Sequence, residues 1–391
     1  MIKKQRIMIT AGFYLPGFKA GGPIRSISNL ANCLGDDYDI FILTSDRDFG
    51  GTTAYPGIRH GEWTNVGKAK VRYLAPWERT FRGVCRAISE VEHDLLYLNS
   101  FFSSWSSMFP MVGRRMGLLP KRPMLVAPRG EFSEGAIALK GLKKRTYVRL
   151  AKSMGIVEDV IWHASSAYEA EDIKCVMGVD GGAVFVASNL SDPPSVDVSQ
   201  GPRDEDARFH VAFLSRISPM KNLDYALEVM SEVGVPVTFN IFGPAEDREY
   251  WQMCQNRMSK FPSHVSAQYH GAVAPEEVPG VLRANDFLLL PTRGENYGHV
   301  IAEALAVGTP VLISDQTPWR GLAERGLGFD LPLSDRSKFV EAMEEGAKLK
   351  PEERFRQRQA THAAMLRYRD ESDDVSANRQ MFRQVIEAGN G

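Results

Sequence analysis

The sequence predicts an α/β protein that consists of two consecutive domains, each built around a parallel β-sheet. Its 391 residues exceed what one hydrophobic core usually organises, so two domains are the first expectation. Short apolar runs alternate with longer helical segments along the chain, which is typical of parallel sheets. A polar tract rich in Pro and Asp, from Asn189 to Asp206, interrupts this alternation and indicates a linker.

The expected strands are the short apolar runs between the helical segments. In the first domain they occupy residues 6–10, 39–44, 70–74, 95–98, 124–127, 160–163 and 183–186. In the second domain they occupy residues 209–214, 237–242, 267–269, 287–290 and 311–313. Ser166 and Glu169 form a capping box that opens one of the helices. From about residue 350 the sequence is charged and helix-forming, with no further strand.

These patterns divide the chain into four segments. Residues 1–190 form the first domain, residues 191–208 the linker and residues 209–365 the second domain. We expect residues 366–391 to form a C-terminal helix that packs back on the first domain. Ligands of such domains usually bind beyond the carboxyl ends of the strands, so a site in a cleft between the domains is expected.

Composition argues against several classes of protein. The formal net charge is −1, which gives no overall field for a polyanionic partner, so no nucleic-acid partner is expected. Cys33, Cys85, Cys175 and Cys254 are scattered and form no disulfide or metal-ligand pattern, as in a reducing cytoplasm. The apolar run at residues 7–10 is too short for a signal peptide, and no stretch approaches the ~18–20 apolar residues of a membrane span. We expect a cytoplasmic protein that at most rests on a membrane surface.

The most informative segment follows the expected strand at residues 287–290. That strand delivers Glu295 on a loop, and a helix starts near Gly298. The free N–H groups and the positive dipole end of this helix point at whatever binds there. His299 and Glu303 are four residues apart and share one helix face, so Glu295 and Glu303 can both face one ligand. The alternative is two unrelated surface glutamates.

Two cations follow the expected strand at residues 209–214. Arg216 ends this strand, and Ser218 and Pro219 suit the N-cap and first position of a helix, so we expect Lys221 in its first turn. Two cations at the positive end of a helix disfavour the helix unless an anion binds there. A diphosphate is the natural candidate, and two solvated surface cations are the alternative.

A glycine pair, Gly21-Gly22, follows the first expected strand and precedes a helix. Without side chains, these residues let a ligand approach the backbone at the helix N-terminus. The surrounding sequence is neither the dinucleotide fingerprint nor a Walker loop, which disfavours NAD binding and ATP hydrolysis. A simple turn is the alternative.

With these three elements, the chain resembles the family 4 retaining glycosyltransferases of the GT-B fold over nearly its whole length. The most specific match is the segment from Glu295 to Glu303, which is similar to the family's E-x7-E motif. The segment around Arg216 and Lys221 is similar to the family's phosphate-binding segment, and the glycine pair to its glycine loop. The resemblance implies two Rossmann-like domains whose parallel sheets face a central cleft, the first binding the acceptor and the second binding the nucleotide sugar.

The resemblance also implies roles for individual residues. It implies that Glu303 holds the ribose hydroxyls and that Glu295, with backbone amides from Asn296 to His299, holds the transferred sugar. Residues 270–273 lie where family members hold the nucleotide base. The expected catalytic residues are Arg216, Lys221 and Glu295. The expected donor-binding residues are Gly21, Gly22, Val273, Asn296, Gly298, His299 and Glu303.

Two departures from the family pattern concern the transferred sugar. Many members carry a histidine after the fourth strand of the first domain. In this chain the corresponding segment, residues 98–102, contains Asn99 but no histidine. Arg129 follows the next strand and is expected, with Asn99, to contact the acceptor or the sugar instead. The chain at the linker reads Asn189-Leu190-Ser191-Asp192 and not the commoner Asn-Gly-Val-Asp. This departure leaves the expected fold unchanged but makes the identity of the transferred sugar harder to infer from the family.

The reaction implied is transfer of a sugar, with retention, from a UDP- or GDP-linked donor to an acceptor hydroxyl. The acceptor is expected to be a saccharide or a lipid-linked saccharide, in polysaccharide, lipopolysaccharide or glycolipid assembly. The enzyme class is a hexosyltransferase that uses no cofactor. No Asp-x-Asp motif stands out as a clamp for a diphosphate and a metal ion, so we expect no essential metal. A sugar-nucleotide epimerase and a non-catalytic sugar-nucleotide-binding protein are the alternatives.

The first domain contains one strongly basic segment, at residues 139–152. Apolar residues lie among its cations at roughly helical spacing, as in helices that rest on membrane surfaces. We therefore expect a peripheral contact with anionic lipid at the inner face of the cell membrane. A solvated charged face is the alternative.

Overall fold

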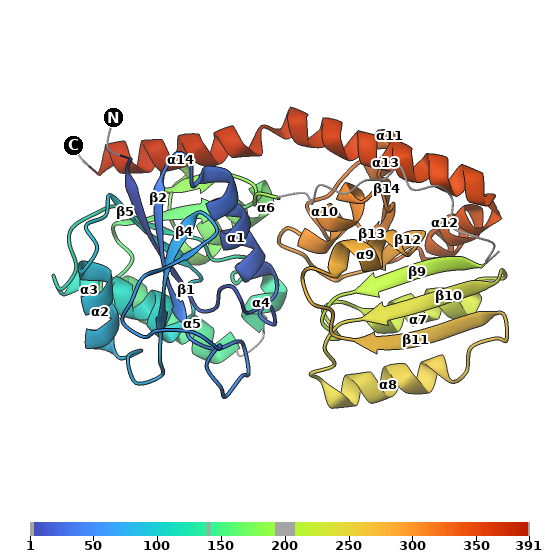
Figure 1. Ribbon diagram of the computed structural model, residues 1–391, viewed down its shortest axis with the longest axis horizontal. Coiled ribbons are helices and arrows are strands. Elements are labelled where there is room, and N and C mark those ends of the chain that lie inside the picture. Colours follow the sequence, from blue (N-terminus) through green and yellow to red (C-terminus); the bar gives the residue numbers. More distant parts are fainter. Residues whose placement is uncertain (1–3, 139–140, 192–207, 390–391) are drawn as a thin grey trace. The chain divides into compact units, whose positions relative to one another are not determined.

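The computed structural model of the protein describes residues 4–138, 141–191 and 208–389. The chain divides into two compact units (Figure 1). The first comprises Met1–Asp192 and Asp373–Gly391, and the second comprises Pro193–Ser372. The expected boundary between residues 365 and 366 falls within a helix, and the units instead divide at Asp373, which has a positive φ of 46°.

The first unit contains an eight-stranded sheet in the order β3-β4-β2-β1-β5-β6-β7-β8. Its strands are β1 (Arg6–Ala11), β2 (Asp39–Ser45), β3 (Thr64–Val66), β4 (Ala69–Leu74), β5 (Leu95–Asn99), β6 (Met124–Val126), β7 (Val160–Ala164) and β8 (Val184–Val186). Its helices are α1 (Gly22–Leu34), α2 (Phe81–Ser89), α3 (Phe109–Arg115), α4 (Glu134–Ala138), α5 (Gly141–Ser153), α6 (Ala167–Met177) and α14 (Asp374–Ala388). Two short turns of helix, η1 (Ser104–Met108) and η2 (Gly181–Ala183), complete it.

Successive side chains of the central strand β1 point to opposite faces of this sheet, as strand geometry requires. Ile7 and Ile9 belong to the hydrophobic cluster that includes α1 and α14, and Met8 belongs to the cluster that includes α2, α3, α5 and α6. The chain first builds the sheet from β1 toward β4 and then returns to the other side of β1 with β5. The topological switch point of the first sheet therefore lies between β1 and β5.

The second unit contains a six-stranded, fully parallel sheet in the order β11-β10-β9-β12-β13-β14. Its strands are β9 (Phe209–Leu214), β10 (Val237–Phe242), β11 (Val265–Gly271), β12 (Phe287–Leu290), β13 (Val311–Ser314) and β14 (Gly328–Leu331). Its helices are α7 (Leu223–Glu232), α8 (Arg248–Met258), α9 (Val278–Arg283), α10 (His299–Ala306), α11 (Leu322–Arg325), α12 (Arg336–Lys348) and α13 (Pro351–Ser372). Its switch point lies between β9 and β12.

Helix α14 follows the second unit in the chain but belongs to the first. Its buried side chains include Met381, Phe382 and Ile386, which pack into the cluster that also contains Ile7 and Tyr97. The Phe382 ring meets the Tyr97 ring edge-to-face with 5.9 Å between centroids.

The structure shows two Rossmann-like α/β domains, as expected, and corrects three details. β3 pairs antiparallel with β4, and β14 adds a parallel edge strand; both were missed. Ser166 does cap α6 by accepting a bond from the Glu169 N–H at 3.2 Å. The Glu169 carboxylate, however, binds Ser165 and the Gly130 N–H, and so does not complete the expected capping box.

Two expectations fall on residues that the structure does not describe. The expected linker at residues 191–208 lies outside the described residues except for its two ends, and the basic segment is described from Gly141 onward. None of the helices among the described residues is long and apolar enough to cross a membrane.

Candidate functional site

Several loops of the second unit meet at its switch point, beyond the carboxyl ends of β9 and β12. The loop after β12 is tied to the loop after β9, because the Arg293 N–H donates to the Met220 carbonyl at 2.9 Å. It is also tied to the loop after β13, where the Glu295 N–H donates to the Gln316 carbonyl at 3.1 Å. Ligands of parallel α/β sheets bind at such switch points.

Lys221 and Glu295, which lie 74 positions apart in sequence, form an ion pair at this point. The side chains are largely buried, with 14% and 17% of their surfaces exposed. The sequence prediction placed Lys221 in the first turn of a helix that begins at Pro219, and this is wrong. Residues 218–222 form a turn instead, and α7 begins at Leu223.

Asn222 explains the later helix start and was missed by sequence reasoning. Its backbone is left-handed, with φ 61°, and its side chain is buried. The side-chain amide donates to the Pro291 carbonyl at 2.8 Å, and its oxygen accepts a bond from Arg293 Nε at 3.0 Å. Asn222 thus joins the two loops that carry Lys221 and Glu295. Asparagine adopts this backbone conformation more readily than most residues, which is the only signal that the sequence offered.

The helix start near Gly298 is confirmed. Gly298 precedes α10 with φ 83°, and a Cβ there would lie 2.7 Å from the Ile301 side chain and 3.1 Å from Glu295 Cγ. Only glycine therefore lets Glu295 pack against the first turn. His299 and Glu303 lie on the half-buried face of α10, and its first turn contains no acidic residue. The positive helix end is thus free of a competing carboxylate of its own.

The other expected donor residues of this unit follow neighbouring strands. Arg216 is exposed, and its guanidinium makes no hydrogen bond or ion pair with any described residue. Gly243, after β10, has φ 131°, and a Cβ there would meet the Ser215 carbonyl at 1.9 Å. The Gly243 N–H donates to the Gly271 carbonyl at 2.7 Å, which fixes the segment that leads to Val273. The carboxyl ends of β9, β10 and β11 are thus held together.

In the first unit, the expected residues gather at the switch point between β1 and β5. Gly21 precedes α1 with φ 69° and ψ −127°, a conformation that favours glycine, and open space surrounds the position of a Cβ. Asn99, at the end of β5, donates from its amide to the Pro23 carbonyl in the first turn of α1 at 3.2 Å. Arg129 Nε donates to the Asn99 oxygen at 2.8 Å.

The Arg129 guanidinium is engaged on every nitrogen. Besides Asn99, it donates to the Asn189 side chain and, at 2.6 Å, to the Tyr97 hydroxyl. Its backbone is left-handed, with φ 56°, which is unusual for a residue other than glycine. Arg129 therefore orients Asn99 and the chain at Asn189; its expected contact with the acceptor or sugar remains a prediction.

His163 extends this network and was missed because it lies on a buried strand. The Tyr97 hydroxyl, which accepts from Arg129, donates to His163 Nδ1 at 2.8 Å, and His163 Nε2 donates to the Ala187 carbonyl at 2.8 Å. Burial, with the charge of Arg129, lowers the pKa of His163 to about 3. The imidazole is thus neutral and works as a structural bridge between strands.

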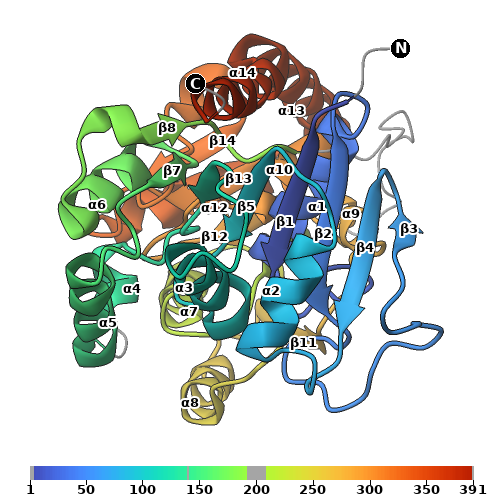
Figure 2. The ribbon, with the colours of Figure 1, turned by 90° about the vertical axis from the view of Figure 1, so that its left-hand side faces the viewer.

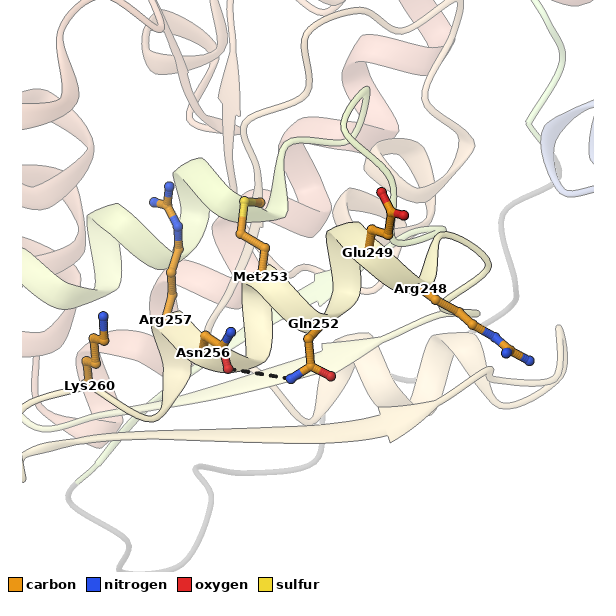
Figure 3. A pocket seen from close by; sticks show the side chains of 7 residues that line it. All are labelled: Arg248, Glu249, Gln252, Met253, Asn256, Arg257 and Lys260. Carbon is orange, nitrogen blue, oxygen red and sulfur yellow. Dashed lines mark hydrogen bonds between the residues drawn. The ribbon is translucent and has the colours of Figure 1, made fainter.

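One surface depression lies elsewhere in the second unit. Figure 3 shows its seven lining side chains, which all come from α8 or from Lys260 just beyond it. The depression has a volume of about 640 Å³, and none of the expected donor residues lines it. It runs along the surface of a single helix and is not a candidate active site. Within the described residues, no group of three or more His, Cys, Asp or Glu side chains is placed to hold a metal ion.

Two α/β domains, with charged and glycine-rich loops at their switch points, define the class as a GT-B-type fold. Comparisons with known proteins agree. Residues 199–362 match the family model of glycosyl transferases group 1. The chain is 27% identical over 287 residues to an uncharacterized 41.2 kDa protein in cps region of Klebsiella pneumoniae, covering 70% of this chain and 75% of that protein.

Solved structures share the fold at low sequence identity. Sucrose-phosphate synthase from Thermosynechococcus elongatus is similar with a TM-score of 0.67 and 15% identity, over 98% of this chain and 100% of that one. HepE from Anabaena, in complex with UDP and glucose, is similar with a TM-score of 0.66 and 15% identity, over 97% and 99%. Together with the family model, these structures support a glycosyltransferase of the GT-B fold.

Proposed function

We propose that the protein is a retaining glycosyltransferase of family 4. It transfers a sugar from a UDP- or GDP-linked donor to an acceptor hydroxyl. The observation that carries this proposal is the Lys221–Glu295 ion pair at the switch point of the second sheet, beside the N-terminus of α10. The match of residues 199–362 to group 1 glycosyl transferases covers all of these residues.

The ion pair suggests how the donor is recognised. In the free protein, Glu295 neutralises Lys221, so the cation is held in place without an anionic ligand. A bound donor exchanges these partners, because its diphosphate takes Lys221 and its sugar hydroxyls take Glu295. Both side chains are already largely buried, so little further ordering is needed.

Positive charge then stabilises the leaving group. When the bond between the anomeric carbon and the β-phosphate oxygen breaks, negative charge grows on the diphosphate. Lys221 and Arg216, with the N–H groups of a helix end, offset that charge. Arg216 is available for this because it makes no ion pair with a described residue. Glu303, one turn along α10, is assigned to the ribose hydroxyls.

Retention is proposed through a front-face route, in which the leaving phosphate accepts the proton of the acceptor hydroxyl. This route needs no enzymatic nucleophile and no metal. Arg216 and Lys221 supply the charge that a metal would otherwise bring.

The proposed pathway is the assembly of surface polysaccharide, lipopolysaccharide or glycolipid. The similar protein in cps region of Klebsiella pneumoniae supports this pathway. The UDP found with HepE favours a UDP-linked donor over a GDP-linked one.

A cytoplasmic protein that contacts the inner face of the membrane is also proposed. The described part of the basic segment forms α5, which carries five cations and no acidic residue: Lys143, Lys144, Arg145, Arg149 and Lys152. Leu142 and Leu150 on the same helix are 84% and 53% exposed. Exposed leucines among cations suit the surface of anionic lipid.

A donor screen tests the proposed function. UDP-, GDP- and ADP-linked sugars are compared by thermal shift and by nucleotide released with and without saccharide acceptors. A true donor at 100 times its dissociation constant adds about 2.7 kcal/mol of stability. Acceptor-dependent release of nucleotide supports the transferase. Conversion of the donor without any acceptor would favour the epimerase, and binding without turnover would favour the non-catalytic alternative.

A further inference from the structure

A cluster of aromatic and charged side chains lies at the carboxyl edge of the first sheet, on the loops after β2 and β4. Because β1, β2 and β4 are parallel neighbours, these loops leave the sheet at the same edge as the segment before α1 (Figure 2). The Asp46 N–H donates to the Leu74 carbonyl at 3.2 Å, and the Asp48 carboxylate accepts the Phe18 N–H at 3.0 Å. The cluster therefore borders the Gly21-Gly22 loop.

Trp77 is the outstanding member of this cluster. Its side chain is 71% exposed, although tryptophan is usually largely buried. It stands on a closed turn, in which the Glu78 N–H donates to the Ala75 carbonyl at 3.0 Å and the Glu78 carboxylate accepts the Ala75 N–H at 2.9 Å. The backbone that carries the exposed indole is therefore held in a defined turn. The ring next to the indole is His60, with 5.7 Å between centroids.

A buried carboxylate holds His60 beside Trp77. The Asp46 side chain is fully buried and accepts bonds from Arg47 at 2.8 and 3.0 Å and from His60 Nε2 at 3.1 Å. Burial opposes the charge of Asp46, yet the bonds from Arg47 and His60 outweigh it and keep the pKa of Asp46 below its usual value. Asp46 is thus occupied by these two partners.

Arg79 on the same loop makes direct side-chain contacts only with neutral groups of the described residues, and the Asp46 carboxylate acts on it at longer range. Its guanidinium donates weakly to the Ser45 hydroxyl at 3.4 Å and lies over the Trp105 ring at 5.8 Å. It forms no ion pair with any residue that the structure describes. N–H donors of Arg79 therefore remain for a ligand, two residues along the chain from the exposed Trp77.

We propose that Trp77, His60 and Arg79 form the subsite for a saccharide acceptor. A pyranose ring has one apolar C–H face and a rim of hydroxyl groups. The indole face of Trp77 matches the apolar face, and Arg79 donates to the hydroxyls or to an acidic group on the sugar. This inference rests on the proposed function for its role in transfer, but binding of the saccharide itself does not require donor chemistry.

Saturation-transfer NMR tests the subsite with defined probes: methyl α-D-glucopyranoside, methyl α-D-galactopyranoside and D-glucuronic acid, each with UDP present. We expect at least one probe to receive saturation from the wild-type protein. Trp77→Ala should weaken its binding about fivefold or more, the size expected for losing an aromatic stacking partner. Trp77→Phe should restore part of the binding. Arg79→Gln should weaken D-glucuronic acid most if an acidic group is recognised, and all probes equally if hydroxyls are.

Met116→Ala is the matched control, because Met116 is 64% exposed and follows α3 at the opposite edge of the sheet. It should bind the probes like the wild type. Saccharide binding that is equal in Trp77→Ala and the wild type, or absent from the wild type for all probes, overturns the subsite. A thermal shift with UDP is measured in parallel on every variant. If UDP does not shift the Tm of the wild-type protein, the result counts against the proposed donor function and not against this subsite.

Discussion

Replacing Lys221 by methionine removes the cation that the proposed mechanism needs and keeps most of the side-chain volume. In the structure, the ammonium group pairs with Glu295 beside the N-terminus of α10. Losing one preorganised donor to a developing negative charge typically lowers turnover about 10²–10³-fold, or roughly 3–4 kcal/mol of barrier. We expect a loss of this size in nucleotide release with donor and acceptor both saturating.

The same change also affects stability. An exposed pair contributes at most about 1 kcal/mol, and breaking a fully buried one costs about 3–5 kcal/mol. The Lys221–Glu295 pair, with 14% and 17% of its side chains exposed, lies between these limits. The free energy of unfolding of the second domain should therefore fall by about 1–3 kcal/mol. Turnover is measured well below the lowered Tm so that unfolding does not imitate a catalytic loss.

Glu295→Gln separates the two members of the pair. It frees Lys221 for the diphosphate, so the Kd for UDP should stay the same or fall a few-fold while turnover drops. Lys338→Met is the control, since Lys338 forms an exposed pair with Asp335 in the same domain. It should leave turnover unchanged. Wild-type turnover in Lys221→Met, or UDP binding that is weakened by Glu295→Gln as much as by Lys221→Met, would refute the partner exchange.

Three further predictions follow from the structure. EDTA should leave turnover unchanged, and activity that disappears with EDTA and returns with Mn²⁺ would contradict the metal-free route. More wild-type protein than Lys143→Gln, Arg145→Gln, Arg149→Gln variant should float with vesicles that contain anionic lipid. Wild-type protein that floats equally with anionic and with neutral vesicles would contradict the membrane contact. His163 is neutral when folded, with a pKa of about 3, but binds a proton near pH 6.5 when unfolded. Its contribution to stability is therefore complete above about pH 6.5 and is lost as the pH falls toward 3, at up to about 1.4 kcal/mol per pH unit. His163→Gln should flatten the fall of Tm between pH 6.5 and 4, and an unchanged slope would contradict a neutral His163.

The sequence predicted the central strands well because they are buried on both faces. β9, β10 and β12 have the bounds expected from their continuous apolar runs. The edge strands β3 and β14 were missed because they are polar or only half-buried, so their sequences lack that pattern. Pairing partners, and not the local sequence, make these segments strands.

The candidate site was predictable where it depends on topology. Loops that follow parallel neighbouring strands meet at one edge, and Lys221 and Glu295 do meet there. The left-handed turn at Asn222 and the network of Arg129, Tyr97 and His163 were not predictable. Arg129 lies 32 residues from Tyr97, and Tyr97 lies 66 residues from His163. Such contacts depend on the folded arrangement and leave no local pattern in the sequence.

The position of α14 has a consequence for how the chain is made. A ribosome synthesises the whole second unit before it reaches Asp374, where α14 begins. Until then, α1 covers one face of the first sheet, but the part of that face that receives Phe382 and Ile386 stays uncovered. The first unit therefore completes its core after the second has been synthesised, and a fragment that stops at Asp192 would expose apolar surface and aggregate.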